Sequence, residues 1–173
     1  KEQGILDNTI LMFTSDHGNM LGNHSLYNIG LFYESCANVP MVLVPTPAQV
    51  KLMGPGRVDN RLVAHADIMP TLLDMCDIPI PSSVEGLSMV GDRTRDHLYG
   101  EFGEDGTASR MIVDSHNKLI YYPVGNRCQL FDLRVDPNEM HDVAADPTYS
   151  DVKTHMLKIL LDKLYGTDLK WIE

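Results

Sequence analysis

The sequence has few cysteines, few basic residues and no long apolar run. Its three cysteines, Cys36, Cys76 and Cys128, lie far apart and form no C-x-x-C pair, which excludes a disulfide framework and a cysteine zinc site. No apolar stretch approaches the roughly 18 residues of a membrane-spanning helix, and the start lacks the basic and apolar segments of a secretory signal. Only 14 Lys and Arg stand against 24 Asp and Glu, and the resulting net charge of −10 argues against a nucleic-acid or anionic-membrane partner.

The length of 173 residues and the hydrophobic content of 43% are those of an ordinary globular chain with one or two packed units. The chain does not begin with methionine, and residues 1–4 resemble the last turn of a helix with its terminating glycine. We therefore expect a fragment of a longer protein. Its compartment stays open, because any export signal would precede the fragment.

The first half has an α/β pattern. Residues 9–14 form a continuous apolar run, which predicts a strand buried on both faces of a parallel sheet. Polar residues 15–18 follow at its carboxyl end, where open α/β sheets bind their ligands. Residues 41–44 predict a second buried strand, and Asp67 is a candidate cap for a helix over 68–75.

The second half has a different pattern of predicted secondary structure. Short β-rich runs predict antiparallel strands over 97–100, 110–114, 118–122 and 128–133. A final amphipathic helix is indicated by apolar residues at helical spacing: Val152, Met156, Ile159, Leu160 and Leu164. We therefore expect two domains, an α/β part over 1–95 and a small antiparallel sheet closed by a helix over 96–173.

The best candidates for a functional site in this sequence are Asp16 and His17. A carboxylate and an imidazole side by side, just after a rigid strand, can both reach a divalent cation. His24, in the following loop, adds a third polar group. The alternative is structural: an Asx-turn at Asp16 with surface histidines beside it.

Four ordered blocks together resemble the sulfatase family of the alkaline-phosphatase-like superfamily. They are the strand and turn of residues 7–18, the loop containing 21–24 and 32–40, the helix 65–74 with its Asp-x-x-Pro-Thr-Leu-Leu pattern, and the late strand and turn 129–139. The resemblance covers nearly the whole chain but only the C-terminal portion of that family. It implies an α/β fold in which this chain completes part of a large mixed sheet with helices.

The resemblance also implies roles for particular residues. Asp16 and His17 look like two ligands of a single divalent cation, usually Ca²⁺, with Mg²⁺ or Mn²⁺ possible. His24 matches a loop histidine near the sulfate or the leaving group, where it can donate a hydrogen bond or a proton. The implied substrate is a small-molecule or saccharide sulfate ester, and the implied partner is the N-terminal part of the same enzyme.

Three departures from the family pattern limit this interpretation. The nucleophile of the family is a formylglycine made within a Cys/Ser-x-Pro-x-Arg motif, and this chain has neither that motif nor the paired aspartates that complete the metal shell. Ile29 occupies the place of a lysine that grips the sulfate. We expect the C-terminal portion of a sulfatase that is inactive by itself.

Two alternative functions remain. The first is a phosphonate or phosphate ester hydrolase of the same superfamily, since such a site accepts other tetrahedral anions. The second is a non-catalytic binding or structural module derived from a sulfatase, which Ile29 favours. The residues upstream of this chain would distinguish the three interpretations, because they include the position of the nucleophile.

Overall fold

The computed structural model describes residues 3–54 and 56–171, which form two compact units. The described residues of the first unit lie within 1–16 and 39–95, and those of the second lie within 17–38 and 96–173. Residues 17–38 thus belong to the same unit as the residues after 95. The predicted helix turn at residues 1–4 lies partly outside the described residues.

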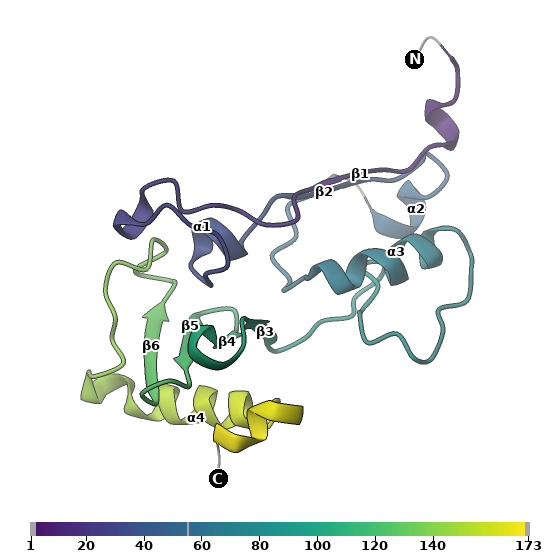
Figure 1. The fold of residues 1–173 in the computed structure, drawn as a ribbon. Helices are drawn as coiled ribbons and strands as arrows, with labels where there is room; N and C mark the ends of the chain where they lie inside the picture. Colours follow the sequence, from purple (N-terminus) through teal and green to yellow (C-terminus); the bar gives the residue numbers. More distant parts are fainter. Residues whose placement is uncertain (1–2, 55, 172–173) are drawn as a thin grey trace. The chain divides into compact units, whose positions relative to one another are not determined.

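The first unit is built around a two-stranded sheet. Its elements are β1 (Leu11–Thr14), β2 (Met41–Val44), α2 (Val50–Met53), α3 (Ile68–Met75) and short 3-10 turns at Leu6–Asn8 and His65–Asp67. The strands β1 and β2 lie side by side and pair antiparallel, with Leu11 opposite Val44 (Figure 1).

The prediction of a parallel strand buried on both faces is therefore wrong for this pair. Along each strand, exposed and half-buried side chains alternate. An apolar run indicates a strand but carries no information about the direction of its neighbour. Here the loop over 17–38 reverses the chain, so that β2 returns alongside β1 in the opposite direction.

The second unit contains an antiparallel sheet of four strands. Its elements are α1 (Glu34–Ala37), β3 (Leu98–Phe102), β4 (Ser109–Val113), β5 (Asn117–Tyr122), β6 (Arg127–Asp132), α4 (Ser150–Leu161) and 3-10 segments at Asn23–Ser25, Asp105–Thr107, Pro147–Tyr149 and Gly166–Trp171. Consecutive strands pair in the order β3-β4-β5-β6. This confirms the predicted antiparallel sheet, with strand ends shifted by one or two residues.

The core of the second unit lies between this sheet and α4. Met156 and Leu160 on α4 are almost completely buried, and they belong to one cluster with Ile112 and Leu119 of the sheet. Figure 1 shows α4, in yellow-green, running along the sheet. The predicted amphipathic helix is confirmed, although Leu164 follows its end and is buried in the same cluster.

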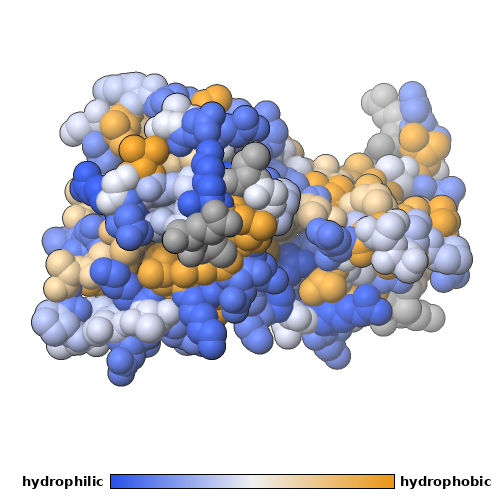
Figure 2. Space-filling model, turned by 60° about the horizontal axis from the view of Figure 1, so that its bottom comes forward, coloured by the Kyte–Doolittle hydropathy of each residue, from blue (hydrophilic) through white to orange (hydrophobic). Residues whose placement is uncertain are grey.

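The surface is mixed in character. Figure 2 shows orange apolar patches among mostly hydrophilic residues. Exposed large apolar side chains include Phe13 on β1 and Val42 on β2. Across the two described stretches, none of the helices is long and apolar enough to cross a membrane.

Candidate functional site

Asp16 and His17 directly follow β1, and both side chains are exposed. The Ser15 hydroxyl donates a hydrogen bond to Asp16 Oδ1 at 3.3 Å. The ring of His65, 50 residues further along the chain, donates from Nε2 to the Ser15 carbonyl at 2.7 Å. A histidine from the start of the α3 region therefore holds the turn that carries Asp16. The contact of His65 was not predictable from the sequence, because no spacing rule links this residue to Ser15.

The side chain of His17 is oriented by its own neighbour. Its Nδ1 donates a hydrogen bond to the Gly18 carbonyl at 2.8 Å. Because a carbonyl can only accept, Nδ1 carries a proton in this contact. A metal-binding histidine has this arrangement, with one ring nitrogen donating to the protein and the other binding the ion.

Gly18 allows the loop after β1 to pass very close to another backbone segment. A Cβ atom at this position would lie 1.9 Å from the carbonyl oxygen of Ser35. The Gly18 amide also donates a hydrogen bond to the Cys36 carbonyl at 2.9 Å. Since both neighbouring atoms belong to backbone, they cannot swing aside as a flexible side chain would. Only glycine fits this crossing without moving the chain.

We therefore expect Gly18→Ala to lower the free energy of unfolding by about 1–3 kcal/mol, the usual cost of forcing extra atoms into a packed place. Urea unfolding followed by circular dichroism measures the change. The matched control is Gly106→Ala in the same unit, where a Cβ would meet nothing within 4 Å. The control is expected to change stability by less than about 1 kcal/mol. Equal effects of the two substitutions would contradict this account of Gly18.

His24 lies in a tightly turned segment of the second unit. The backbone has positive φ at Leu21 (44°), Gly22 (100°), His24 (53°) and Ser25 (61°). The His24 ring stacks on the ring of Tyr33, with centroids 4.2 Å apart and planes inclined by 19°. Non-glycine residues with positive φ are uncommon and often mark functional segments. His24 was predicted as a site residue but Tyr33 was not, because a ring contact made by such a turn has no characteristic spacing in the sequence.

A cavity of about 660 Å³ opens beside His24 within the second unit. Its lining is polar and includes two carboxylates and several asparagine and serine side chains from different segments. The lining residues are Gly22, Asn23, His24, Ser25, Glu34, Ser35, Asn38, Pro137, Asn138, Glu139 and Met140. An imidazole at the edge of a polar cavity of this size can donate or accept a proton with a group of a bound molecule.

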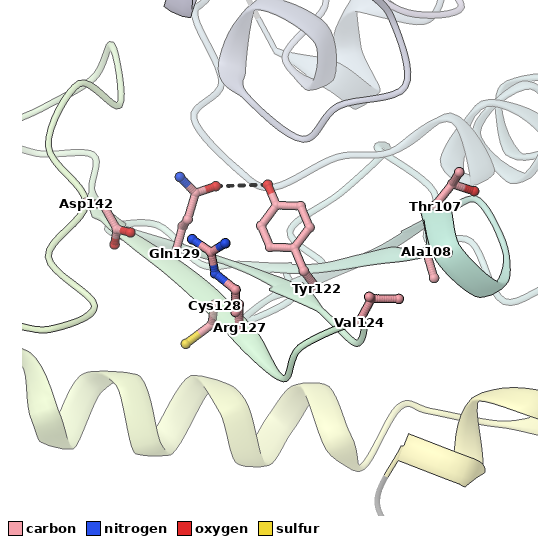
Figure 3. Close-up of a pocket in the computed structure, with 9 residues that line it drawn as sticks. Thr107, Ala108, Tyr122, Val124, Arg127, Cys128, Gln129 and Asp142 are labelled. Atoms are coloured by element: carbon pink, nitrogen blue, oxygen red, sulfur yellow. Dashed lines mark hydrogen bonds between the residues drawn. The ribbon is translucent and has the colours of Figure 1, made fainter.

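A second cavity of about 450 Å³ lies near the turn between β5 and β6 (Figure 3). Gln129 Oε1 accepts hydrogen bonds from the hydroxyls of Tyr122 at 2.9 Å and Tyr33 at 3.1 Å. Burial raises the pKa of the Tyr122 hydroxyl well above its ordinary value, and nearby Tyr33 and Asp142 add to the shift. This hydroxyl therefore stays protonated at neutral pH and acts as a hydrogen-bond donor. None of the three predicted site residues lines this cavity.

The predicted residues do not form a complete metal shell by themselves. Within residues 3–54 and 56–171, no three His, Cys, Asp or Glu side chains are placed to hold one ion. Ile29, where the family resemblance implies a lysine, is an exposed apolar side chain in the same loop as His24. The chain offers an incomplete set of ligands and no cation at position 29.

Comparison with known proteins identifies the fold and the family. Residues 22–165 match the family model described as N-sulphoglucosamine sulphohydrolase, C-terminal. An arylsulfatase of Clostridium perfringens is 37% identical over an alignment of length 175. The alignment covers 96% of this chain and 36% of that protein.

Solved structures agree with this assignment. The structure of BT4656 with its substrate D-glucosamine-2-N,6-O-disulfate superposes with a TM-score of 0.82 at 24% identity, covering 93% of this chain and 35% of that one. The phosphonate monoester hydrolase of Agrobacterium radiobacter has a TM-score of 0.79 at 28% identity, covering 93% and 36%. The chain therefore spans about a third of the length of these relatives.

The family match extends over most of the chain and includes the segment that carries His24, while the similarity to the arylsulfatase covers almost all of it. The structural matches place the same residues in the alkaline-phosphatase-like α/β fold. This chain belongs to the sulfatase family and corresponds to the C-terminal portion of its members.

Proposed function

We propose that this chain is the C-terminal part of a sulfuric ester hydrolase in which Asp16 and His17 bind a divalent cation and His24 acts on the leaving group. The observation that carries the proposal is the 37% identity to an arylsulfatase over 96% of this chain. The exposed Asp16–His17 pair after β1 and the His24 ring beside a polar cavity are consistent with it. The proposed substrates are small-molecule or saccharide sulfate esters.

The metal donors fit only part of a coordination shell. A carboxylate and an imidazole are both ligand types of divalent cations, but Ca²⁺ prefers six to eight oxygen ligands. The remaining ligands and the formylglycine nucleophile would come from the preceding part of the enzyme. When bound, the cation would neutralise the charge of the ester oxygens.

The part of His24 in hydrolysis is a proton transfer. Attack at sulfur breaks the bond between sulfur and the ester oxygen, and the alcohol leaves as an alkoxide unless it receives a proton. In the proposed mechanism the His24 ring supplies that proton to the ester oxygen, and the proton that the attacking hydroxyl loses restores the ring. Sulfate then departs with the attacking oxygen, which a water molecule replaces. The Tyr33 ring orients the imidazole for this transfer through the stacking contact.

The first unit offers a surface on which the preceding part of the enzyme can pack. Leu11 and Phe13 on β1 face Val44 and Val42 on β2, and all four side chains are about half exposed. Apolar cross-strand pairs normally cover a core. The relatives are about three times as long as this chain, so we assign this surface to their N-terminal part.

A chimera tests the proposed function. The part of the Clostridium perfringens arylsulfatase that precedes its match is joined to the start of this chain and produced in a host in which the intact arylsulfatase is active. We expect the chimera to hydrolyse an aryl sulfate above the buffer rate and the isolated chain not to do so. A folded chimera without any hydrolysis would favour the non-catalytic module, and activity of the isolated chain would contradict our account of the missing nucleophile.

A phosphonate or phosphate ester hydrolase remains the second candidate, favoured by the similarity to the Agrobacterium radiobacter enzyme. The same chimera distinguishes the two if it is assayed on an aryl sulfate, an aryl phosphonate and an aryl phosphate. A higher kcat/KM for the phosphonate than for the sulfate would overturn the sulfatase assignment.

Ile29 gives a separate prediction. If a cation at this position stabilises the sulfate during reaction, Ile29→Lys in the chimera is expected to raise kcat/KM for an aryl sulfate by about 100-fold. The matched control is Tyr27→Lys, which adds the same charge to an exposed position in the same loop. An equal increase for the control would attribute the effect to the overall charge of the loop. An unchanged rate for Ile29→Lys would contradict the role implied for this position.

A further inference from the structure

A lysine is almost completely buried on β5 between two glutamates. Lys118 is 1% exposed, and its ammonium group forms ion pairs with Glu34 Oε1 and with Glu139 Oε1, the latter at 2.8 Å. Glu139 is also buried, whereas the side chain of Glu34 is 29% exposed. A buried ammonium group is tolerated only when charged partners compensate for its lost hydration. Glu139 is the buried one of these two partners.

The second oxygen of Glu139 binds a different part of the unit. Its Oε2 accepts a hydrogen bond from the Glu34 amide at 2.6 Å, across a separation of 105 residues. This amide directly follows Tyr33 in the chain. One carboxylate therefore joins the buried lysine to the backbone beside Tyr33: its Oε1 forms the ion pair with Lys118 and its Oε2 accepts the hydrogen bond from the Glu34 amide.

Tyr33 is also held at the other end of its side chain. Its hydroxyl donates to Gln129 Oε1 at 3.1 Å, and Gln129 lies on β6. The ring is thus fixed between the sheet and the Glu139 contact. His24 stacks on this ring with centroids 4.2 Å apart. A displacement of the backbone at Glu34 moves the surface on which the imidazole lies.

We infer that Glu139 is a positioning residue for His24: its carboxylate, paired with the buried Lys118, fixes the backbone at Glu34 and so the Tyr33 ring that orients the imidazole. The placement of His24 follows from these contacts alone. Its consequence for catalysis rests on the proposed function, in which His24 protonates the leaving group.

The substitution Glu139→Gln separates this role from a general contribution to stability. A carboxylate accepts hydrogen bonds on both oxygens, whereas a carboxamide accepts on one and donates from its nitrogen. If the carboxamide that replaces Glu139 accepts from the Glu34 amide, its NH₂ group takes the place of the oxygen that faces the Lys118 ammonium, and the ion pair is lost. The double variant Glu139→Gln, Lys118→Met removes this conflict, because the amide oxygen is then free to accept from Glu34 while methionine fills the buried space.

The first readout is the nuclear magnetic resonance signal of the His24 ring in this chain, assigned from its loss in His24→Asn. The stacked Tyr33 ring shifts this signal away from that of an isolated histidine. We expect Glu139→Gln to move it toward the isolated value and the double variant to restore it. The control Asp132→Asn changes another buried carboxylate of the unit, one bonded to Arg134 and Tyr149, and is expected to leave the signal in place.

An unchanged His24 signal in folded Glu139→Gln, or an equal displacement in Asp132→Asn, would overturn the inference. If Glu139→Gln does not fold, Gln129→Leu takes its place, since it removes the partner of the Tyr33 hydroxyl and leaves Glu139 and Lys118 intact. That variant is expected to move the His24 signal in the same direction. No displacement in folded Gln129→Leu would also overturn the inference.

The second readout is activity in the chimera. Misplacing a reacting group costs up to about 100-fold in rate, so Glu139→Gln is expected to lower kcat by about 10-fold to 100-fold with little change in KM. A displaced His24 signal with full activity would leave the positioning intact and reject the catalytic role proposed for His24. An unmoved signal would reject the positioning whatever the activity.

Discussion

Asp16→Asn in the chimera is expected to lower kcat/KM for an aryl sulfate by about a thousandfold. Asparagine keeps the size of the side chain, and its amide oxygen still accepts the hydrogen bond from the Ser15 hydroxyl. The substitution therefore removes charge while leaving the turn intact. Loss of one group that stabilises charge in the transition state typically costs about 100-fold to 1,000-fold, and a weakened metal site adds to this loss. Initial rates at several Ca²⁺ concentrations measure both effects.

The variant is expected to need more Ca²⁺ for half-maximal activity than the parent chimera. The matched control is Asp7→Asn, an equal loss of charge at an exposed position ahead of β1 in the same unit. It should retain nearly full activity and the parental Ca²⁺ dependence. Activity of Asp16→Asn within a few-fold of the parent would remove Asp16 from the proposed metal site and leave it as a turn residue.

The small sheet was predictable because its information is local. The runs over β3 to β6 are separated by short turns, and short connections bring consecutive strands together in antiparallel pairs. Helix α4 was equally predictable, since its apolar residues recur at helical spacing over a long segment. In both cases, residues near one another in the chain decide the structure.

The antiparallel pairing of β1 and β2 and the contacts around His24 were not predictable in this way. The direction of β2 depends on how the loop over 17–38 folds, and an apolar run does not encode it. Lys118 lies 84 residues from Glu34, and Glu139 lies 105 residues from the same residue. In a sequence, charged residues so far apart along the chain cannot be distinguished from ordinary surface residues. Asp16, His17 and His24 were predicted from their residue types after a strand and from the family resemblance, whereas the contact of Tyr33 with His24 required the structure.

Asp67 shows a similar difference in the first unit. It was predicted to cap α3, but its carboxylate makes other contacts. Its oxygens accept hydrogen bonds from the amides of Ala64 and Leu87 at 2.8 and 2.7 Å. They also pair with both terminal nitrogens of Arg95 at 2.7 and 2.6 Å. Asp67 is 1% exposed, so this carboxylate ties its own turn to Leu87 and Arg95 within the interior of the unit.

Asp67→Asn is therefore expected to lower the free energy of unfolding by about 3–5 kcal/mol, the usual cost of removing one partner of a buried ion pair. Urea unfolding at pH 7 measures the change. The matched control is Asp59→Asn, which breaks a more exposed pair with Arg61 in the same unit. The control is expected to cost less because the Asp59 side chain is 35% exposed to water, and an effect as large as that of Asp67→Asn would contradict this assignment.

The pH dependence of stability gives the same prediction a second test. Burial alone raises the pKa of the Asp67 carboxyl, but the hydrogen bonds from Arg95 and from the amides of Ala64 and Leu87 outweigh it and hold the pKa below its ordinary value. The folded state therefore binds this proton less readily than the unfolded state, whose carboxyl titrates near about pH 3.9. The stability that the ionised Asp67 carboxyl contributes is therefore complete above that pH. It is lost as the pH falls through the lower pKa of the folded state. Because asparagine does not titrate, Asp67→Asn should lose less stability than the wild-type chain between about pH 4 and the onset of acid unfolding. Parallel pH profiles in the two proteins would mean that Asp67 is not charged and paired in the folded state.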